Sequence, residues 1–150
     1  MNIPNILIEE GCKKYIAALE KLENQCFSLP WTKEQLESQM PDDRHIFLVA
    51  KLGDSVIGYA GMMYIIDEGY ISNVAVDGAH RKSGIGSLLI EELLHRAEAL
   101  NLRFVSLEVR ETNEPAKALY GKYDFEPVGL RKNYYDSPKE NAIIMTRFLK

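Results

Sequence analysis

The apolar positions of the chain follow two spacings, one typical of strands and the other of helices. Short apolar runs bounded by turn residues predict strands at 3–8, 45–51, 56–66, 70–76, 103–109, 125–130 and 142–149. Apolar residues three or four positions apart predict helices at 16–26 and 87–100. Two shorter helices are expected from their start signals. Thr32 and Gln35 resemble a capping box before a helix ending near 40, and Asn113 and Pro115 open a helix that continues through 120.

The resulting order, β-α-α-β-β-β-α-β-α-β-β, predicts a mixed α/β (α+β) domain with a largely antiparallel sheet. Turns at 52–55 and 67–69 join neighbouring strands into hairpins, and the helix at 87–100 supplies a crossover. The sequence contains no internal repeat, low-complexity segment or linker-like run. Residues 1–150 are therefore predicted to form a single domain.

Composition narrows the class of protein further. The chain has 46% hydrophobic and 27% charged residues, an ordinary globular balance, and its net charge of -4 argues against a direct nucleic-acid partner. No apolar run approaches the ~18 residues that cross a bilayer, and the N-terminus lacks a secretory signal. We therefore expect a cytoplasmic protein without membrane contact, with Cys12 and Cys26 as reduced thiols. The three histidines, His45, His80 and His95, form no metal-binding pair, so no metal is expected.

The most specific segment lies after the strand at 70–76 and directly before a helix. It reads Arg81-Lys82-Ser83-Gly84-Ile85-Gly86. Its glycines allow unusual backbone angles, so that successive N–H groups at the helix N-terminus can bind a pyrophosphate. Arg81 and Lys82 add positive charge to this loop. The alternative is a flexible loop with a glycine N-cap. The segment matches neither the Walker loop nor the dinucleotide pattern G-x-G-x-x-G.

Two signatures in the chain resemble a known family. The first is a strand that ends Asn73-Val74-Ala75-Val76-Asp77, followed by the pattern [QR]-x-x-G-x-[GA] and a leucine-rich helix. It is similar to the acetyl-coenzyme A (acetyl-CoA) site of the GNAT superfamily, the Gcn5-related N-acetyltransferases. The second signature follows the family's downstream pattern and comprises Leu107-Glu108-Val109-Arg110, Asn113, Ala116, Ala118-Leu119-Tyr120 and Phe125.

The resemblance covers nearly the whole chain. With Pro30-Trp31, Glu108 in L-E-V-R and Asn133-Tyr134-Tyr135, it looks most similar to the RimI-type branch. That branch acetylates the N-terminal alanine of a small-subunit ribosomal protein. The resemblance implies the GNAT fold, with seven mostly antiparallel strands and about four helices. It also implies a protein N-terminus as acceptor and a monomer or weak dimer.

The resemblance further implies acetyl-CoA as co-substrate and suggests where it binds. The strands at 70–76 and 103–109 would splay apart, and the pantetheine arm would pair with exposed backbone of the first, much like an added strand. A backbone N–H there would polarise the thioester carbonyl. The implied coenzyme contacts are Val74, Ala75, Val76, Arg81, Lys82, Ser83, Gly84, Ile85, Gly86, Ser87 and Asn113. Without the resemblance, residues 74–76 read as sheet core and Asn113 as a simple N-cap.

Acetyl transfer to an amine needs a group that removes a proton from the amine, because an α-amino group has a pKa near ~8 and is largely protonated at neutral pH. Glu108 is the candidate base, a carboxylate in an otherwise apolar strand. From spacing alone it could equally lie on a solvent face or pair with Arg110 or Arg103. The resemblance to RimI-type enzymes implies the catalytic role.

The coenzyme leaves as a thiolate, so a nearby acid helps its departure. Tyr120 is the candidate, although a tyrosine in an amphipathic helix is commonly a core residue. In the family this tyrosine points at the coenzyme sulfur. Trp31 and Tyr134 are candidate contacts to the acceptor, with Tyr135 a weaker one, or else aromatic caps of a core edge.

Two other functions remain open from the residues: acetylation of a small amine, and a non-catalytic module that binds acetyl-CoA. A deep closed acceptor pocket would favour the first. The presence of Glu108 and Tyr120 argues against the second, which a lack of turnover above background would favour. Asp124 departs from the family pattern, which has glycine before Phe125. Because Asp tolerates a left-handed backbone better than most residues, we expect the same turn at a modest cost.

Overall fold

The computed structural model describes residues 5–150, so residues 3 and 4 of the first predicted strand lie outside it. Its elements follow the predicted order. They are β1 (Ile6–Glu10), α1 (Ile16–Cys26), α2 (Lys33–Ser38), β2 (His45–Leu52), β3 (Ser55–Ile65), β4 (Glu68–Val76), α3 (Ile85–Ala99), β5 (Phe104–Arg110), α4 (Glu114–Lys122), β6 (Glu126–Asp136) and β7 (Lys139–Phe148). The Thr32–Gln35 capping box at the start of α2 is confirmed.

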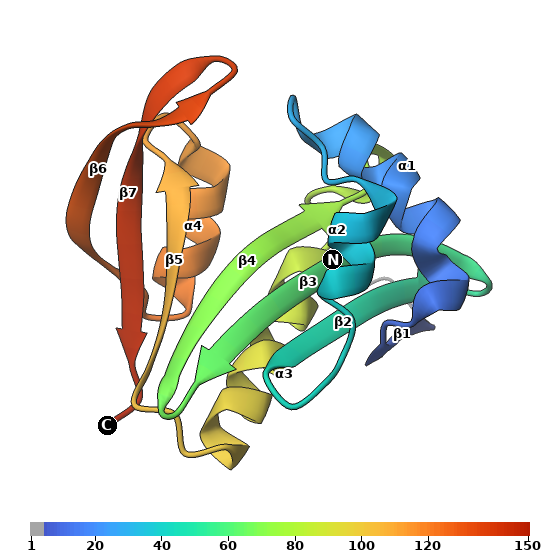
Figure 1. Cartoon of the computed structure of the whole chain (residues 1–150), viewed down its shortest axis with the longest axis horizontal. Coiled ribbons are helices and arrows are strands. Elements are labelled where there is room, and N and C mark those ends of the chain that lie inside the picture. The colour runs from blue at the N-terminus through green and yellow to red at the C-terminus, as the bar shows by residue number, and fades with distance from the viewer. Residues whose placement is uncertain (1–4) are drawn as a thin grey trace.

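The seven strands form one mixed sheet in the order β1-β2-β3-β4-β5-β7-β6. Only β4 and β5 run parallel, and their registered pairs stop after three positions, Glu68–Phe104, Gly69–Val105 and Tyr70–Ser106. Beyond Tyr70 and Ser106, β4 pairs with β3 and β5 with β7. The sheet is therefore split into two halves that meet at one end and diverge toward the other (Figure 1).

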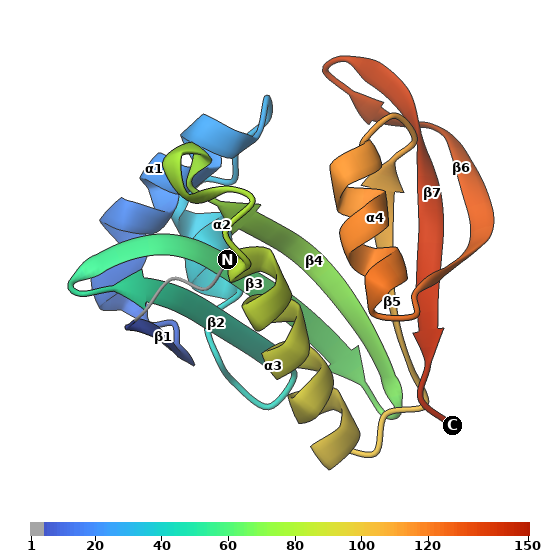
Figure 2. The same ribbon diagram turned by 180° about the vertical axis from the view of Figure 1, so that it is seen from behind.

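Helices cover both faces of the first half of the sheet. Helices α1 and α2 lie on one face, and α3 lies on the other, the face shared with α4 (Figure 2). The apolar residues that the helical spacing places on one face of α3, Leu89, Leu93, Leu94 and Ala97, are buried. The buried residues of α3 belong to one apolar cluster. A second apolar cluster fills the space under α1 and α2, around Phe47 and Tyr59, whose rings stack 5.1 Å apart. None of the helices described is long and apolar enough to cross a membrane.

Strand β6 is longer than predicted. It continues to Asp136, so Tyr134 and Tyr135 lie on a strand and not on a loop. The pattern failed here because ten of the eleven positions of β6 are exposed, which leaves no alternating buried face to detect. The register with β7 is also irregular, and Asn133 has a left-handed backbone angle (φ 54), so the strand departs from regular alternation.

The expected turn at Asp124 is confirmed. Asp124 has φ 65 and follows the C-cap of α4. The Phe125 N–H donates to the Tyr120 carbonyl and the Asp124 N–H to the Gly121 carbonyl, which is a Schellman motif with aspartate in the glycine position. The Phe125 ring lies 5.8 Å from that of Tyr120, so the motif also fixes the helix turn that carries Tyr120.

Candidate active site

A cleft of about 750 Å³ opens where β4 and β5 diverge. Seven of the candidate site residues from the sequence line it: Trp31, Val74, Glu108, Asn113, Tyr120, Tyr134 and Tyr135. They come from the α1–α2 segment, β4, β5, α4 and β6. The split in the sheet thus brings together residues that lie more than 100 positions apart in the chain.

Strand β4 presents an edge to the cleft that does not pair with β5 beyond Tyr70. The register with β3 shifts at Ser72, which is skipped between the pairs Gly61–Asn73 and Met62–Ile71. Val74 lines the cleft, whereas the side chain of Ala75 is buried in the cluster under α1. Ala75 could therefore contact a ligand only through its backbone, as a strand-like pantetheine arm would require.

The loop before α3 has the backbone that an anion site needs. Gly84, the N-cap of α3, has φ 89, and Lys82 also lies in the left-handed region with φ 62. Gly86 lies in the first turn of α3, where its backbone N–H has no partner within the helix, and its contact with coenzyme stays a prediction. A Cβ there would come 3.1 Å from Leu119 Cδ2, so its missing side chain lets α3 and α4 approach closely.

Side chains around this loop are held in place by hydrogen bonds. The Arg81 guanidinium donates to the Val76 carbonyl (3.2 Å) and to the Cys26 sulfur (3.4 Å), so it ties the loop to the end of β4 and to α1. The Ser83 hydroxyl donates to the His80 carbonyl, and Lys122 donates to the Ser87 hydroxyl (3.1 Å). The cleft residues do not include 81–87, which lie at the N-terminus of α3.

Glu108 lies in the cleft on β5 and is partly exposed. Its carboxylate forms an ion pair with Arg131 of β6 at 3.3 Å, and not with either arginine considered from the sequence. Arg110 instead pairs with Glu140, and Arg103 with Asp67 and Glu68. The partner was not predictable because Arg131 reaches Glu108 across the intervening strand β7.

Tyr120 is 8% exposed and lines the cleft from α4. Burial raises the pKa of its phenol well above the ordinary value, so the hydroxyl keeps its proton at neutral pH. Asn113 is the N-cap of α4 and accepts the Ala116 N–H at 3.2 Å. The N-cap role of Asn113 is therefore confirmed, and contact with coenzyme stays a prediction.

Aromatic side chains flank the cleft on both sides. Trp31 follows α1 on one side, while Tyr134 and Tyr135 lie on β6 at the other, with their rings 5.0 Å apart. Tyr135, the weaker candidate from the sequence, is less exposed than Tyr134 and stacks under the Arg110 guanidinium at 4.3 Å. Burial, with the nearby charge of Glu108 as a smaller cause, raises the pKa of Tyr135 to about 12.

Sequence analysis missed a buried carboxylate in the wall of the cleft. Glu23 of α1 is 0% exposed and contacts Trp31, Tyr59 and Asn73. The available signal was its position, four residues after Leu19 and so within the apolar stripe of the helix. Among residues 5–150, no group of three or more acidic, cysteine or histidine side chains is placed to hold a metal ion.

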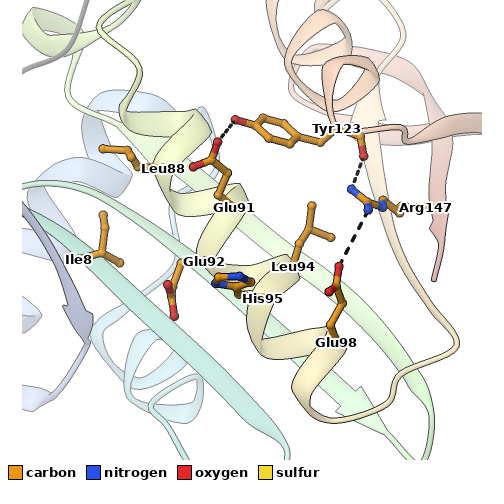
Figure 3. Close-up of a pocket in the computed structure, with 9 residues that line it drawn as sticks. All are labelled: Ile8, Leu88, Glu91, Glu92, Leu94, His95, Glu98, Tyr123 and Arg147. Carbon is orange, nitrogen blue, oxygen red and sulfur yellow. Dashed lines mark hydrogen bonds and ion pairs between the residues drawn. The ribbon is translucent and has the colours of Figure 1, made fainter.

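A second hollow, of about 460 Å³, lies along the outer side of α3 and contains none of the predicted site residues (Figure 3). Tyr123 donates to Glu91 at 2.8 Å, and Arg147 contacts both the Tyr123 carbonyl (3.1 Å) and Glu98 (4.0 Å). These contacts join α3 to the half of the sheet that carries β5–β7. We therefore assign this hollow a structural role.

The split leaves an edge of β4 to which an extended ligand can pair, and the N-terminus of α3, capped by Gly84, can bind an anion. The model of the acetyltransferase (GNAT) family matches residues 16–125, so the chain belongs to this family. It is an acetyl-CoA-dependent N-acetyltransferase, which confirms the predicted class of enzyme and acetyl-CoA as co-substrate.

Curated relatives and solved structures agree with this assignment. The putative ribosomal protein bS18-alanine N-acetyltransferase of Bacillus subtilis is 32% identical over 126 residues, 83% of each chain. The bS18-alanine N-acetyltransferase of Haemophilus influenzae is 32% identical over 134 residues, covering 87% of this chain and 90% of the relative. The crystal structure of the Escherichia coli S18-alanine N-acetyltransferase superposes with a TM-score of 0.89 at 26% identity, over 97% and 94% of the two chains.

Proposed function

We propose that this enzyme acetylates the N-terminal α-amino group of a protein, specifically the N-terminal alanine of a small-subunit ribosomal protein. The observation that carries the proposal is the cleft, which places Glu108 and Tyr120 between aromatic walls from two separate parts of the chain. The resemblance to the bS18-alanine N-acetyltransferases, at about one third identity over most of the chain, supports this acceptor. Such an acceptor requires a cytoplasmic enzyme, which stays a prediction.

The proposed chemistry is direct attack of the amine on the thioester. Glu108 takes one proton from the incoming ammonium group, directly or through a water, and the neutral amine then attacks the thioester carbonyl. As the carbon–sulfur bond breaks, Tyr120 gives its proton to the departing sulfur and regains one from the nitrogen of the tetrahedral intermediate, while Glu108 releases its proton to solvent. Burial raises the pKa of Tyr120 and keeps its phenol protonated at neutral pH, so the place of Tyr120 in the cleft, and not a raised acidity, supports this role. We place the pantetheine arm along residues 74–76 and the pyrophosphate at the loop of residues 81–87. Asn113 is a further proposed contact to the coenzyme.

The shape of the acceptor side favours a polypeptide over a small amine. Leu29 and Tyr134, on opposite walls of the cleft, are 66% and 50% exposed. The Ser28 hydroxyl donates to the Ser137 carbonyl and so connects the α1–α2 segment to the turn between β6 and β7. A small-amine site would enclose its ligand, whereas the exposed Leu29 and Tyr134 side chains can contact a chain that continues into solvent. The presence of both catalytic candidates in one cleft disfavours a non-catalytic module.

The test uses two peptides, purified enzyme and acetyl-CoA, with products measured by mass spectrometry. One peptide begins with a free alanine, and the other has a blocked N-terminus and an internal lysine. We expect one acetyl group on the first peptide alone, and a fall in kcat of about 10²–10³-fold for Glu108→Gln and ~10-fold or more for Tyr120→Phe. Acetylation of neither peptide, with coenzyme binding intact, would reject the proposal.

A further inference from the structure

Glu23 is the only charged side chain that is fully buried among residues 5–150. It projects from the last turns of α1 into the wall of the cleft, on the side where Trp31 lies. A carboxylate removed from water is costly unless other groups satisfy its oxygens, so its retention in this position needs a reason. Burial raises the pKa of Glu23, which agrees with that cost.

The carboxylate of Glu23 joins three other segments of the chain. Its Oε1 accepts the backbone N–H of Trp31 at 2.7 Å. Its Oε2 accepts the Tyr59 hydroxyl of β3 and the Asn73 side-chain amide of β4, the latter at 3.3 Å. The Asn73 amide also donates to the Tyr59 oxygen at 3.2 Å, which closes a small network. Helix α1, the α1–α2 segment, β3 and β4 therefore meet at this one carboxylate.

The network lies in the wall of the cleft that an acceptor would meet, whereas Cys26 makes the contact between α1 and the Arg81 side chain of the coenzyme loop. Trp31 belongs to the α1–α2 wall of the cleft, which also includes Phe27, Ser28 and Leu29. Asn73 directly precedes Val74 on the free edge of β4, and it follows the register shift at Ser72. Glu23 thus connects the wall that an acceptor would meet to the strand along which the thioester would lie.

We propose that Glu23 is a positioning residue of the acceptor site. By holding the Trp31 N–H and the Asn73 amide together, its carboxylate fixes the α1–α2 wall at a set distance from the edge of β4. That distance determines how the N-terminal residue of the acceptor is presented to Glu108. The proposal rests on the proposed function, and Glu23 itself takes no part in proton transfer.

A charge is better suited to this task than an apolar contact. Packing alone would hold the wall against α1 without fixing its register, whereas hydrogen bonds to a carboxylate specify both direction and distance. Glutamine at this position keeps the size of the side chain but turns one of the two acceptors into a donor. The amide would then face the Tyr59 hydroxyl and Asn73 amide, or the Trp31 N–H, with the wrong polarity.

The test compares Glu23→Gln with Glu20→Gln, which makes the same charge change one turn earlier on α1 at a partly exposed position. Kinetics with the alanine peptide are combined with acrylamide quenching of Trp31, the only tryptophan in the chain. For Glu23→Gln we expect a KM for the peptide about tenfold higher, kcat within ~2-fold and unchanged acetyl-CoA affinity, together with stronger quenching. Glu20→Gln should match the wild type.

Peptide KM and Trp31 quenching that stay at wild-type values in Glu23→Gln would overturn the proposal. Acetyl-CoA affinity that falls by the same factor as the peptide KM rises would also overturn it, because such a change indicates general loosening of the fold. Should Glu23→Gln fail to fold, Tyr59→Phe removes one donor to the same carboxylate and must show the same changes in smaller degree. A wild-type enzyme that acetylates neither peptide rejects the proposed function, while Trp31 quenching still decides the role of Glu23.

Discussion

At the scale of single residues, two tyrosines set the character of the cleft, the buried Tyr120 and the partly buried Tyr135. Both phenols have pKa values raised by burial, that of Tyr135 to about 12. Tyr135 is further held between the Arg110 guanidinium and the ring of Tyr134. The cleft is therefore lined by phenols that are neutral at physiological pH, and the charged side chains that line it include Glu108, Arg110 and Asp136.

The raised pKa of Tyr135 predicts how stability depends on alkaline pH. The unfolded chain releases this proton near pH 10, whereas the folded protein holds it to about pH 12. The stabilising contribution is thus complete below pH ~10 and is lost as the pH rises above it. Between pH 10 and 11, the free energy of unfolding of the wild type should fall more steeply than that of Tyr135→Phe, by up to ~1.4 kcal/mol per pH unit.

Urea unfolding at a series of pH values measures this difference. Tyr134→Phe is the matched control, since it removes the neighbouring phenol from a half-exposed position. A Tyr135→Phe variant with the same alkaline slope as the wild type would contradict the assignment of Tyr135 as a buried phenol.

At the scale of elements, the start of α3 depends on the left-handed angle of Gly84 (φ 89). Alanine at position 84 is strained in that conformation and would shift the N–H groups that open the helix. We expect Gly84→Ala to weaken acetyl-CoA binding about tenfold, as measured by calorimetry.

Gly53 provides a control for the effect of backbone strain alone. It has φ 61 in the turn between β2 and β3, and a Cβ there would meet nothing within 4 Å. Both Gly53→Ala and Gly84→Ala should lower the free energy of unfolding by ~1 kcal/mol, but Gly53→Ala should leave coenzyme affinity unchanged. Equal affinities in the two variants would remove the loop of residues 81–87 from the proposed coenzyme site.

The elements also show how far sequence reasoning reaches. Local signals were sufficient for the caps at Thr32 and Asn113 and for the turn at Asp124, because each depends on residues within one turn of helix. The length of β6 could not be predicted, since an exposed strand carries no apolar alternation. The contacts of Glu23 and the Glu108–Arg131 pair depend on chain segments that only the folded sheet brings together.

At the scale of the whole molecule, two halves of the sheet are joined by three registered positions between β4 and β5. On the far side, Tyr123 and Arg147 add contacts to Glu91 and Glu98 of α3. A coenzyme seated in the split would bridge these halves by pairing with the free edge of β4. A ligand that binds only the folded protein stabilises it by ~2.7 kcal/mol when its free concentration is a hundred times its Kd, and we expect this gain for acetyl-CoA.

Hydrogen exchange with and without acetyl-CoA tests where this stabilisation acts. We expect slower exchange at residues 71–76 of β4, whose edge faces the split, and little change in β1 and β2 on the far side of the sheet. Protection confined to the α1–α2 segment would contradict a coenzyme that lies along β4.

The open edge of β4 also bears on how the enzyme would respond to the state of the cell. An arm recognised through strand-like backbone pairing is held in the same way whether or not it carries an acetyl group. Free CoA should then bind with nearly the same affinity as acetyl-CoA and compete with it for the site. Where the two forms together saturate the site, the rate of acetyl transfer would follow the ratio of acetyl-CoA to free CoA and not the concentration of acetyl-CoA alone.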